Sequence, residues 1–156
     1  EDVLYIARRV VRMAAEDIGL ADPRALSLAL SAKEAYEFLG SPEGELAVAE
    51  AVIYLATAPK SNRAYRAWGD ALTAAREHPA EPVPLHIRNA PTALMKRLGY
   101  GHGYRYDHDE GGHAAGQEYL PETLRGARWY EPSGHGFEKT LAERIEWWAS
   151  RRKKAD

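Results

Sequence analysis

The sequence of 156 residues predicts an all-α protein. Within the first 77 residues, apolar side chains recur at spacings of three and four, the period that places them on one face of a helix. Each predicted helix end is followed closely by a new helix start, and such short loops place consecutive helices antiparallel. We therefore expect a compact array of antiparallel helices, then a long loop region rich in aromatic residues and glycine, and finally a C-terminal helix.

The first two helices are defined by their end signals. One helix is expected over residues 3–18, because Gly19 fits the left-handed position that ends a helix. Asp22 and Pro23 then supply an N-terminal cap and a proline at the first helical position, where its missing N–H has no cost. They predict a second helix over residues 23–39.

The next two helices follow the same logic. Ser41 and Pro42 repeat the start signal of the second helix. The apolar run over residues 46–58 is hydrophobic on most faces, which predicts a buried central helix. A fourth helix is expected over residues 61–78.

The second half of the chain has a different character. Prolines in residues 78–84 favour extended backbone, and Asn89 is expected to cap a short helix that ends before Gly99. Residues 99–136 hold most of the glycines and five of the nine tyrosines with little periodicity, so we expect loops pinned by aromatic side chains and a short turn at 121–124. A last helix is expected over 137–153.

The composition excludes several classes of function. The chain has no cysteine, so it has no disulfide, thiolate nucleophile or iron–sulfur cluster. No apolar run approaches the roughly 18 residues of a membrane span, so we expect no membrane association and a cytoplasmic location. The net charge of −2 excludes a uniformly basic nucleic-acid-binding protein, although residues 60–97 carry seven Lys or Arg against three Asp or Glu.

We assign no catalytic and no cofactor-binding residue. A phosphate-binding P-loop needs a Lys followed by Ser or Thr, and the glycine-containing stretch at residues 40–45 has acidic residues instead. Ser133 lies near His135 but lacks the strand and helix that frame a nucleophile, so we expect it to cap the last helix. This chain alone is not expected to hydrolyse ATP.

A cluster of histidines and a carboxylate suggests a metal site that we favour least. Imidazole and carboxylate groups suit zinc, manganese or iron. His108 and His113, however, are five residues apart across two glycines, which disfavours one helix that aligns them. We interpret these groups as hydrogen-bonding partners of loop backbone. The weakest alternative is a helical metal-dependent hydrolase whose site would consist of His102, His108, Asp109 and His113.

The basic span gives a second alternative, direct contact with DNA. Its candidate contact residues are Lys60, Arg63, Arg66, Arg88, Lys96 and Arg97. Phosphate contacts of this kind make affinity fall steeply with salt. Aromatic residues between 100 and 130 alternate with Arg105 and Arg128 and could stack on bases, but we favour loop packing for them.

Several long motifs resemble one known family. AYEFLGSPEGELA (residues 35–47), AVIYLATAPKSN (51–62) and PVPLHIRNAP (82–91) are similar to the C-terminal region of the replication-associated recombination protein A family, also called MgsA. The later pieces LGYGHGYRYDHD, YLP and WYEPS look like the same region, so the similarity covers nearly the whole chain. Members of this family are AAA+ ATPases and include the Werner helicase-interacting protein.

The resemblance implies a non-catalytic helical domain that follows an ATPase core and lid and assembles the protein into homotetramers. It implies DNA and single-strand-binding protein as partners at stalled replication forks, and a location in the cytoplasm with the nucleoid. It also implies that parts of the parent protein outside this chain bind ATP and Mg. We expect residues 1–156 to be one oligomerisation and regulatory domain, the C-terminal fragment of such an ATPase, with about residues 1–20 adjoining the missing lid. The subunit interface is expected among the helices around Leu46 to Trp68.

Overall fold

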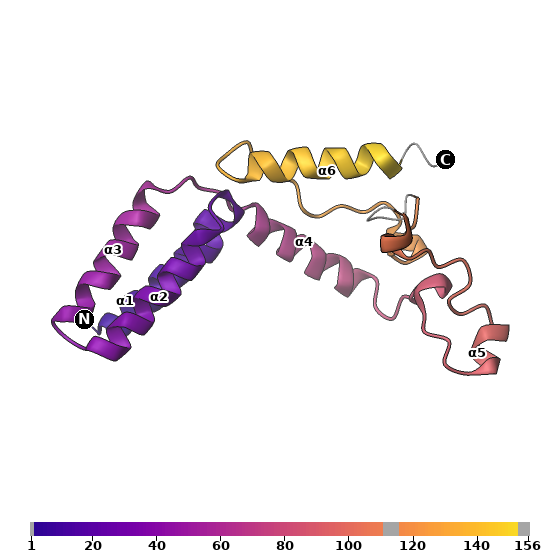
Figure 1. Cartoon of the computed structure of the whole chain (residues 1–156), viewed down its shortest axis with the longest axis horizontal. Coiled ribbons are helices and arrows are strands. Elements are labelled where there is room, and N and C mark those ends of the chain that lie inside the picture. The colour runs from indigo at the N-terminus through magenta and orange to yellow at the C-terminus, as the bar shows by residue number, and fades with distance from the viewer. Residues whose placement is uncertain (1, 111–115, 153–156) are drawn as a thin grey trace. The chain divides into compact units, whose positions relative to one another are not determined.

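A computed structural model describes residues 2–110 and 116–152 of the chain. Over these residues the backbone forms six α-helices, short 3-10 and π-helical turns, and no β-strand (Figure 1). The all-α prediction is therefore confirmed. No helix in the described ranges is both long enough and apolar enough to cross a membrane.

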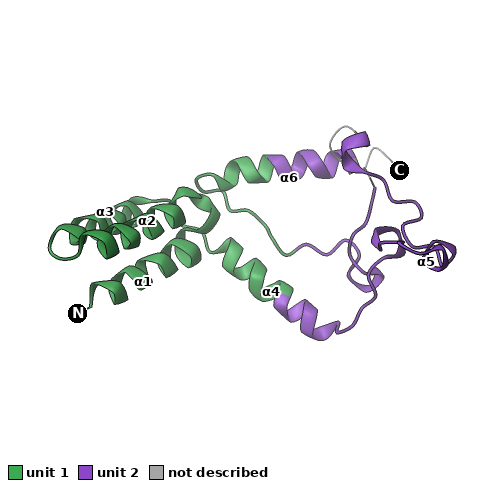
Figure 2. Ribbon diagram, turned by 60° about the horizontal axis from the view of Figure 1, so that its bottom comes forward, with its two compact units in different colours: residues 1–71, 129–143 green, residues 72–128, 144–156 purple. Residues whose placement is uncertain are grey.

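The chain divides into two compact units, which Figure 2 shows in separate colours. The first unit comprises residues 1–71 and 129–143, and the second comprises residues 72–128 and 144–156. Helix α4 (Arg63–Glu77) and helix α6 (Glu138–Arg152) each contribute residues to both units.

The first unit is built on three packed helices, α1 (Val3–Met13), α2 (Arg24–Leu39) and α3 (Glu43–Thr57). Helices α2 and α3 form an antiparallel hairpin, and α1 packs against both (Figure 1). Helix α1 continues as a π-helical turn over Ala14–Ile18 and a 3-10 turn over Gly19–Ala21. The expected end signals hold, since Gly19 and Gly40 both have positive φ.

The core of this unit consists largely of alanine. Its buried residues are Val10, Ala14, Ile18, Ala25, Ala29, Ala32, Ala51 and Leu55. Small side chains let helix backbones approach closely. One such approach lies at Gly44, where an added Cβ would be 2.7 Å from the Cα of Tyr36. A core of this kind leaves the larger apolar side chains of the same helices outside it.

Helix α3 does not have the predicted buried, central position. It buries one stripe formed by Gly44, Val48, Ala51 and Leu55, while Leu46 and Ile53 are 66% and 65% exposed. The apolar run shows that the helix is hydrophobic on most faces, but only α1 and α2 pack against it extensively. One face of α3 therefore remains in solvent in this chain.

The second unit contains the expected loops. Helix α5 (Ala93–Arg97) is short, and 3-10 turns cover Leu85–Ile87, Asp107–Glu110 and Glu122–Leu124, the last at the predicted turn. The cap of α5 is Thr92 and not Asn89: the Thr92 hydroxyl accepts the N–H of Met95 at 3.2 Å. Thr92 has extended backbone immediately before the first helical residue, whereas Asn89 lies four residues before it.

Candidate interaction surfaces

An apolar stripe runs along the outer face of α3. Leu46, Ala49, Ile53 and Ala56 are all exposed and lie at spacings of three and four, so they share one side of the helix. We call these four residues the α3 stripe. Isolated exposed leucines are common on protein surfaces, but a continuous apolar row is typical of a surface that contacts another molecule.

Further large apolar side chains are exposed on the helices next to α3 in the sequence. Phe38, at the end of α2, is 89% exposed. Tyr65 and Trp68 lie three residues apart on α4 and are 60% and 65% exposed. The region expected to hold the subunit interface, from Leu46 to Trp68, is thus rich in exposed apolar side chains.

A buried carboxylate joins the start of α6 to the segment before α4. The Glu138 side chain is fully buried, and its Oε2 accepts the Ser61 hydroxyl and the Ser133 backbone N–H, both at 2.7 Å. Its Oε1 accepts the Tyr130 hydroxyl at 2.9 Å. Burial by itself raises the pKa of Glu138, but the hydrogen bonds from Ser133, Ser61 and Tyr130 outweigh it and keep the pKa below its ordinary value.

The same group of residues explains two neighbouring details. Burial, followed by the effect of Glu138, raises the pKa of the Tyr130 hydroxyl, so Tyr130 stays a hydrogen-bond donor. Ser133 does not cap α6 as expected: its hydroxyl accepts the N–H of His135 at 3.3 Å, while its own N–H serves Glu138. These hydrogen bonds hold the Glu138 carboxylate between two segments of the chain, which gives it a structural role.

A second carboxylate fixes the start of α2. Asp22 Oδ1 accepts the backbone N–H of Arg24 at 3.1 Å, as predicted for a cap, and Oδ2 accepts the hydroxyl of Tyr54 from α3. The hydrogen bond from the Arg24 side chain lowers the pKa of Asp22. Burial acts in the opposite direction, and the hydrogen bond from Tyr54 lowers the pKa further. Asp22 is thus a cap and also a link between α2 and α3.

The predicted DNA-contact residues fall into two groups. Lys60, Arg63 and Arg66 lie together at the end of α3 and the start of α4, in the first unit. Lys60 is engaged within the chain, since its Nζ donates to the carbonyl oxygens of Leu55 at 2.5 Å and Ala58 at 3.3 Å. Arg66 is exposed and Arg63 is half-buried.

The remaining three candidates lie in the second unit. Lys96 and Arg97 are exposed on α5. Arg88 is tied to its own loops: its Nε donates to the Val83 carbonyl at 2.5 Å, and its guanidinium lies 5.1 Å from the centre of the Tyr100 ring. Each unit thus contains three of the six candidate residues.

A cavity of about 510 Å³ lies beside the first of these groups. Its lining includes Lys60, Arg63 and His135 together with Asp17 and Asn62. Asp17 belongs to the π-helical turn, a rare backbone form that is often found at functional sites. Apolar side chains of Met13, Ile18 and Leu55 also line the cavity, and among its charged residues the basic ones outnumber the acidic one.

The described residues give the metal hypothesis no geometric support. His102, His108 and Asp109 are exposed, and the His108 ring lies 5.0 Å from that of Tyr106. Within residues 2–110 and 116–152, no three His, Cys, Asp or Glu side chains converge as a metal site requires. His113 lies outside the described residues, so the four-residue site stays a prediction.

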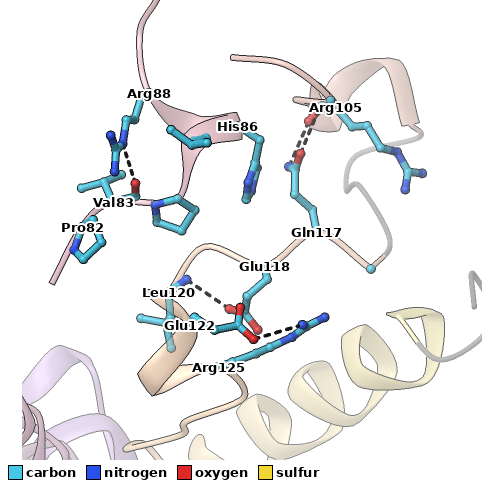
Figure 3. A pocket seen from close by; sticks show the side chains of 14 residues that line it. Pro82, Val83, His86, Arg88, Arg105, Gln117, Glu118, Leu120, Glu122 and Arg125 are labelled. Atoms are coloured by element: carbon cyan, nitrogen blue, oxygen red, sulfur yellow. Dashed lines mark hydrogen bonds and ion pairs between the residues drawn. The ribbon is translucent and has the colours of Figure 1, made fainter. Parts of the chain in front are cut away.

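The second unit contains a larger cleft of about 600 Å³, between residues 82–88 and residues 116–125 (Figure 3). One wall is fixed by Gln117, whose side chain accepts the Arg105 N–H at 2.8 Å and donates to the Arg105 carbonyl at 3.1 Å. Glu118 accepts backbone N–H groups, and the bond from Leu120 is the main cause of its lowered pKa.

The His86 ring projects between these walls (Figure 3), and its buried Nε2 has no hydrogen-bonding partner among the residues that the structure describes. Gln117 and Glu118 are both committed to backbone groups. The cleft is thus a well-defined loop framework, but it contains no arrangement of acid, base and nucleophile.

Two tryptophans on α6 belong to none of the functional sites predicted from the sequence. Trp147 and Trp148 are 46% and 40% exposed, and their ring centres are 4.6 Å apart in an edge-to-face arrangement. Their adjacency and the basic sequence after them were visible signals. Glu138 had no such signal, because its partner Ser61 is 77 residues away along the chain.

Comparison with known proteins gives one consistent result. The family model described as the C-terminal region of MgsA AAA+ ATPases matches residues 1–149. Replication-associated recombination protein A of Coxiella burnetii is 56% identical over 148 residues, which cover 94% of this chain and 34% of that protein. The Escherichia coli K12 protein of the same name is 49% identical over 149 residues, covering 95% of this chain and 33% of that protein.

A eukaryotic relative gives the same picture. ATPase WRNIP1 of Dictyostelium discoideum is 45% identical over 130 residues, covering 82% of this chain and 15% of that protein. The chain thus spans about a third of the length of the bacterial relatives and less of the eukaryotic one.

Proposed function

Because the chain belongs to the MgsA AAA+ ATPase C-terminal family, we propose that it is the non-catalytic oligomerisation and regulatory domain of a DNA-dependent ATPase that acts at stalled replication forks. The parent protein would bind ATP and Mg through residues outside this chain and would work with DNA and single-strand-binding protein, in the cytoplasm at the nucleoid. The relatives' name places them in replication-associated recombination.

The observation that carries this proposal is the α3 stripe. The core of the first unit is filled mainly by alanine, and the larger apolar residues Leu46 and Ile53 lie outside it, 66% and 65% exposed among the described residues. Exposed apolar area of this kind favours association by the hydrophobic effect, and identical chains usually associate with closed symmetry. We propose that the stripe packs against other copies in a homotetramer.

Light scattering after gel filtration tests this interface. The wild-type chain at tens of micromolar is expected to have the mass of a tetramer, and Ile53→Glu is expected to shift it to smaller species, because a charge would be buried in the interface. Ser31→Glu adds the same charge at an exposed polar position of α2 and serves as the control. Circular dichroism should show unchanged helix content in both variants.

A monomeric wild-type chain would contradict the proposal. A tetramer that survives Ile53→Glu would show that the α3 stripe is not the interface.

Direct DNA contact is the second candidate, supported by the basic side chains of the half-buried Arg63 and the exposed Arg66 at the start of α4. Each phosphate contact with duplex DNA contributes about 0.9 to the slope of log affinity against log salt concentration. Combining Arg63→Gln with Arg66→Gln is expected to lower that slope by about 2 if both residues contact phosphates. Duplex binding that is absent, or that has an unchanged slope in the double variant, would remove this candidate.

A further inference from the structure

The C-terminal helix α6 exposes an aromatic pair on one side. The helix side formed by Leu141, Ile145 and Ala149 is half-buried, whereas Trp147 and Trp148 lie on its exposed side. Tryptophan provides the largest apolar surface of any side chain and is usually well buried. Two adjacent exposed rings therefore offer a substantial aromatic surface to a partner.

Cationic side chains accompany this pair. The Arg151 guanidinium carbon lies 4.2 Å from the centre of the Trp147 ring, within the range of a cation–π contact. Arg144 lies about one helical turn before the two tryptophans. Over residues 144–154 the sequence has five Lys or Arg and one Glu, a strongly positive segment in a chain with a net charge of −2.

This combination limits the chemistry of the partner. Single-stranded nucleic acid presents a flat π-face and a negative charge in every nucleotide, and aromatic rings beside basic residues are the usual means of binding it. Duplex DNA hides its base faces in the stack, and an acidic peptide supplies charge with few planar groups. We propose that Trp147, Trp148 and Arg151 form a stacking platform for single-stranded nucleic acid.

The present contact of Arg151 suggests how a base is accommodated. Its planar guanidinium covers the Trp147 ring at 4.2 Å, a distance similar to that of a stacked base. Arg151 is exposed, so it is able to move aside when a base stacks on the ring. The displaced guanidinium would then pair with the adjacent phosphate. The platform uses none of the α3 stripe and goes beyond the oligomerisation proposal.

Fluorescence anisotropy with a labelled 12-nucleotide oligo-dT tests the platform in the 156-residue chain at low salt. Loss of one base–aromatic stack typically weakens binding about tenfold, so Trp147→Leu is expected to have that effect while keeping an apolar side chain. Trp147→Phe keeps a ring and should restore most of the affinity. Arg151→Gln should lower the salt slope by about 0.7, the contribution of one phosphate contact in a single strand.

Tyr5→Leu is the control, because Tyr5 is an exposed aromatic residue on α1 in the other unit. It should leave the affinity for oligo-dT unchanged, and a duplex of the same length should bind the wild-type chain more weakly.

The proposal is overturned if oligo-dT does not bind at low salt, or if Trp147→Leu and Tyr5→Leu have equal effects. It is also overturned if Trp147→Leu changes the mass measured by light scattering, since the pair would then be part of a protein interface. A monomeric wild-type chain that binds oligo-dT through Trp147 would support the platform and contradict only the oligomerisation proposal.

Discussion

The buried carboxylate of Glu138 permits a quantitative prediction about stability. Glu138→Leu removes the acceptor of three hydrogen bonds, including that of the part-buried Ser133 N–H. A buried unsatisfied donor costs about 1–3 kcal/mol, and each lost hydrogen bond to a charged group contributes a comparable amount. The two hydroxyls can rotate toward other acceptors, so we expect a total loss of about 3 kcal/mol in the free energy of unfolding.

Glu138→Gln should be much milder. The amide oxygen can replace Oε2 and accept from Ser61 and Ser133, and the amide nitrogen can donate to the Tyr130 oxygen in place of Oε1. Only the advantage of an ionised acceptor is lost, which predicts a destabilisation of about 1 kcal/mol at pH 7.

The pH dependence of the free energy of unfolding shows how much of the effect of Glu138 comes from its negative charge. The folded protein holds the pKa of Glu138 below its ordinary value. The carboxylate therefore stabilises the fold above the unfolded-state pKa, about 4.3, and this contribution is lost as the pH falls through the lower folded pKa. The difference between wild type and Glu138→Gln should accordingly shrink toward zero in acid, where both side chains are neutral. Asp22 and Glu118 also have lowered pKa values but affect both proteins equally.

Urea denaturation followed by circular dichroism at several pH values measures these differences. Glu143→Gln, an exposed substitution on the same helix, is the control and should change stability by less than about 0.5 kcal/mol. The reasoning is refuted if Glu138→Leu is as stable as the control, or if the effect of Glu138→Gln is the same at pH 3 and pH 7.

Three further predictions concern packing and caps. Gly44→Ala should lower the melting temperature, because the added Cβ would lie 2.7 Å from a backbone carbon of α2. Gly69→Ala in α4 should instead raise the free energy of unfolding by about 0.5–1 kcal/mol, because the space around Gly69 is open and alanine favours the helix. Tyr54→Phe removes the hydrogen bond to Asp22 and should cost about 1 kcal/mol in urea denaturation, an effect that must fade in acid as the carboxylate becomes protonated. Thr92→Ala should destabilise the short helix α5 by about 1 kcal/mol, seen as faster amide hydrogen exchange there, and unchanged exchange would exclude its capping role.

Local signals in the sequence predicted the helices well because they act over about one helical turn. Gly40 ends α2 with a positive φ, and Asp22 caps that helix through its side chain, both as predicted. The sequence predicted Asn89 as the cap of α5, but the cap is Thr92. The prediction was wrong because both residue types cap helices and a five-residue helix has little periodicity to show where it starts.

The candidate surfaces were only partly predictable. The basic residues were visible in the sequence, but their separation into two groups and the internal bonds of Lys60 and Arg88 depend on the folded backbone. The exposed pair Trp147 and Trp148 was visible as a dipeptide, but its exposure was not, because a helix of unknown packing gives no indication of which side faces solvent.

The sequence by itself determined that the chain is helical, where most helices begin and end, and which family its motifs resemble. These properties depend on residues within a few positions of one another, or on the order of motifs. Only the tertiary structure decided that α3 keeps an apolar face in solvent and that Glu138 is buried against Ser61, 77 residues away. Burial is set by what packs against a side chain, and in this protein an alanine-rich core brings the helices together while leaving their larger apolar residues outside.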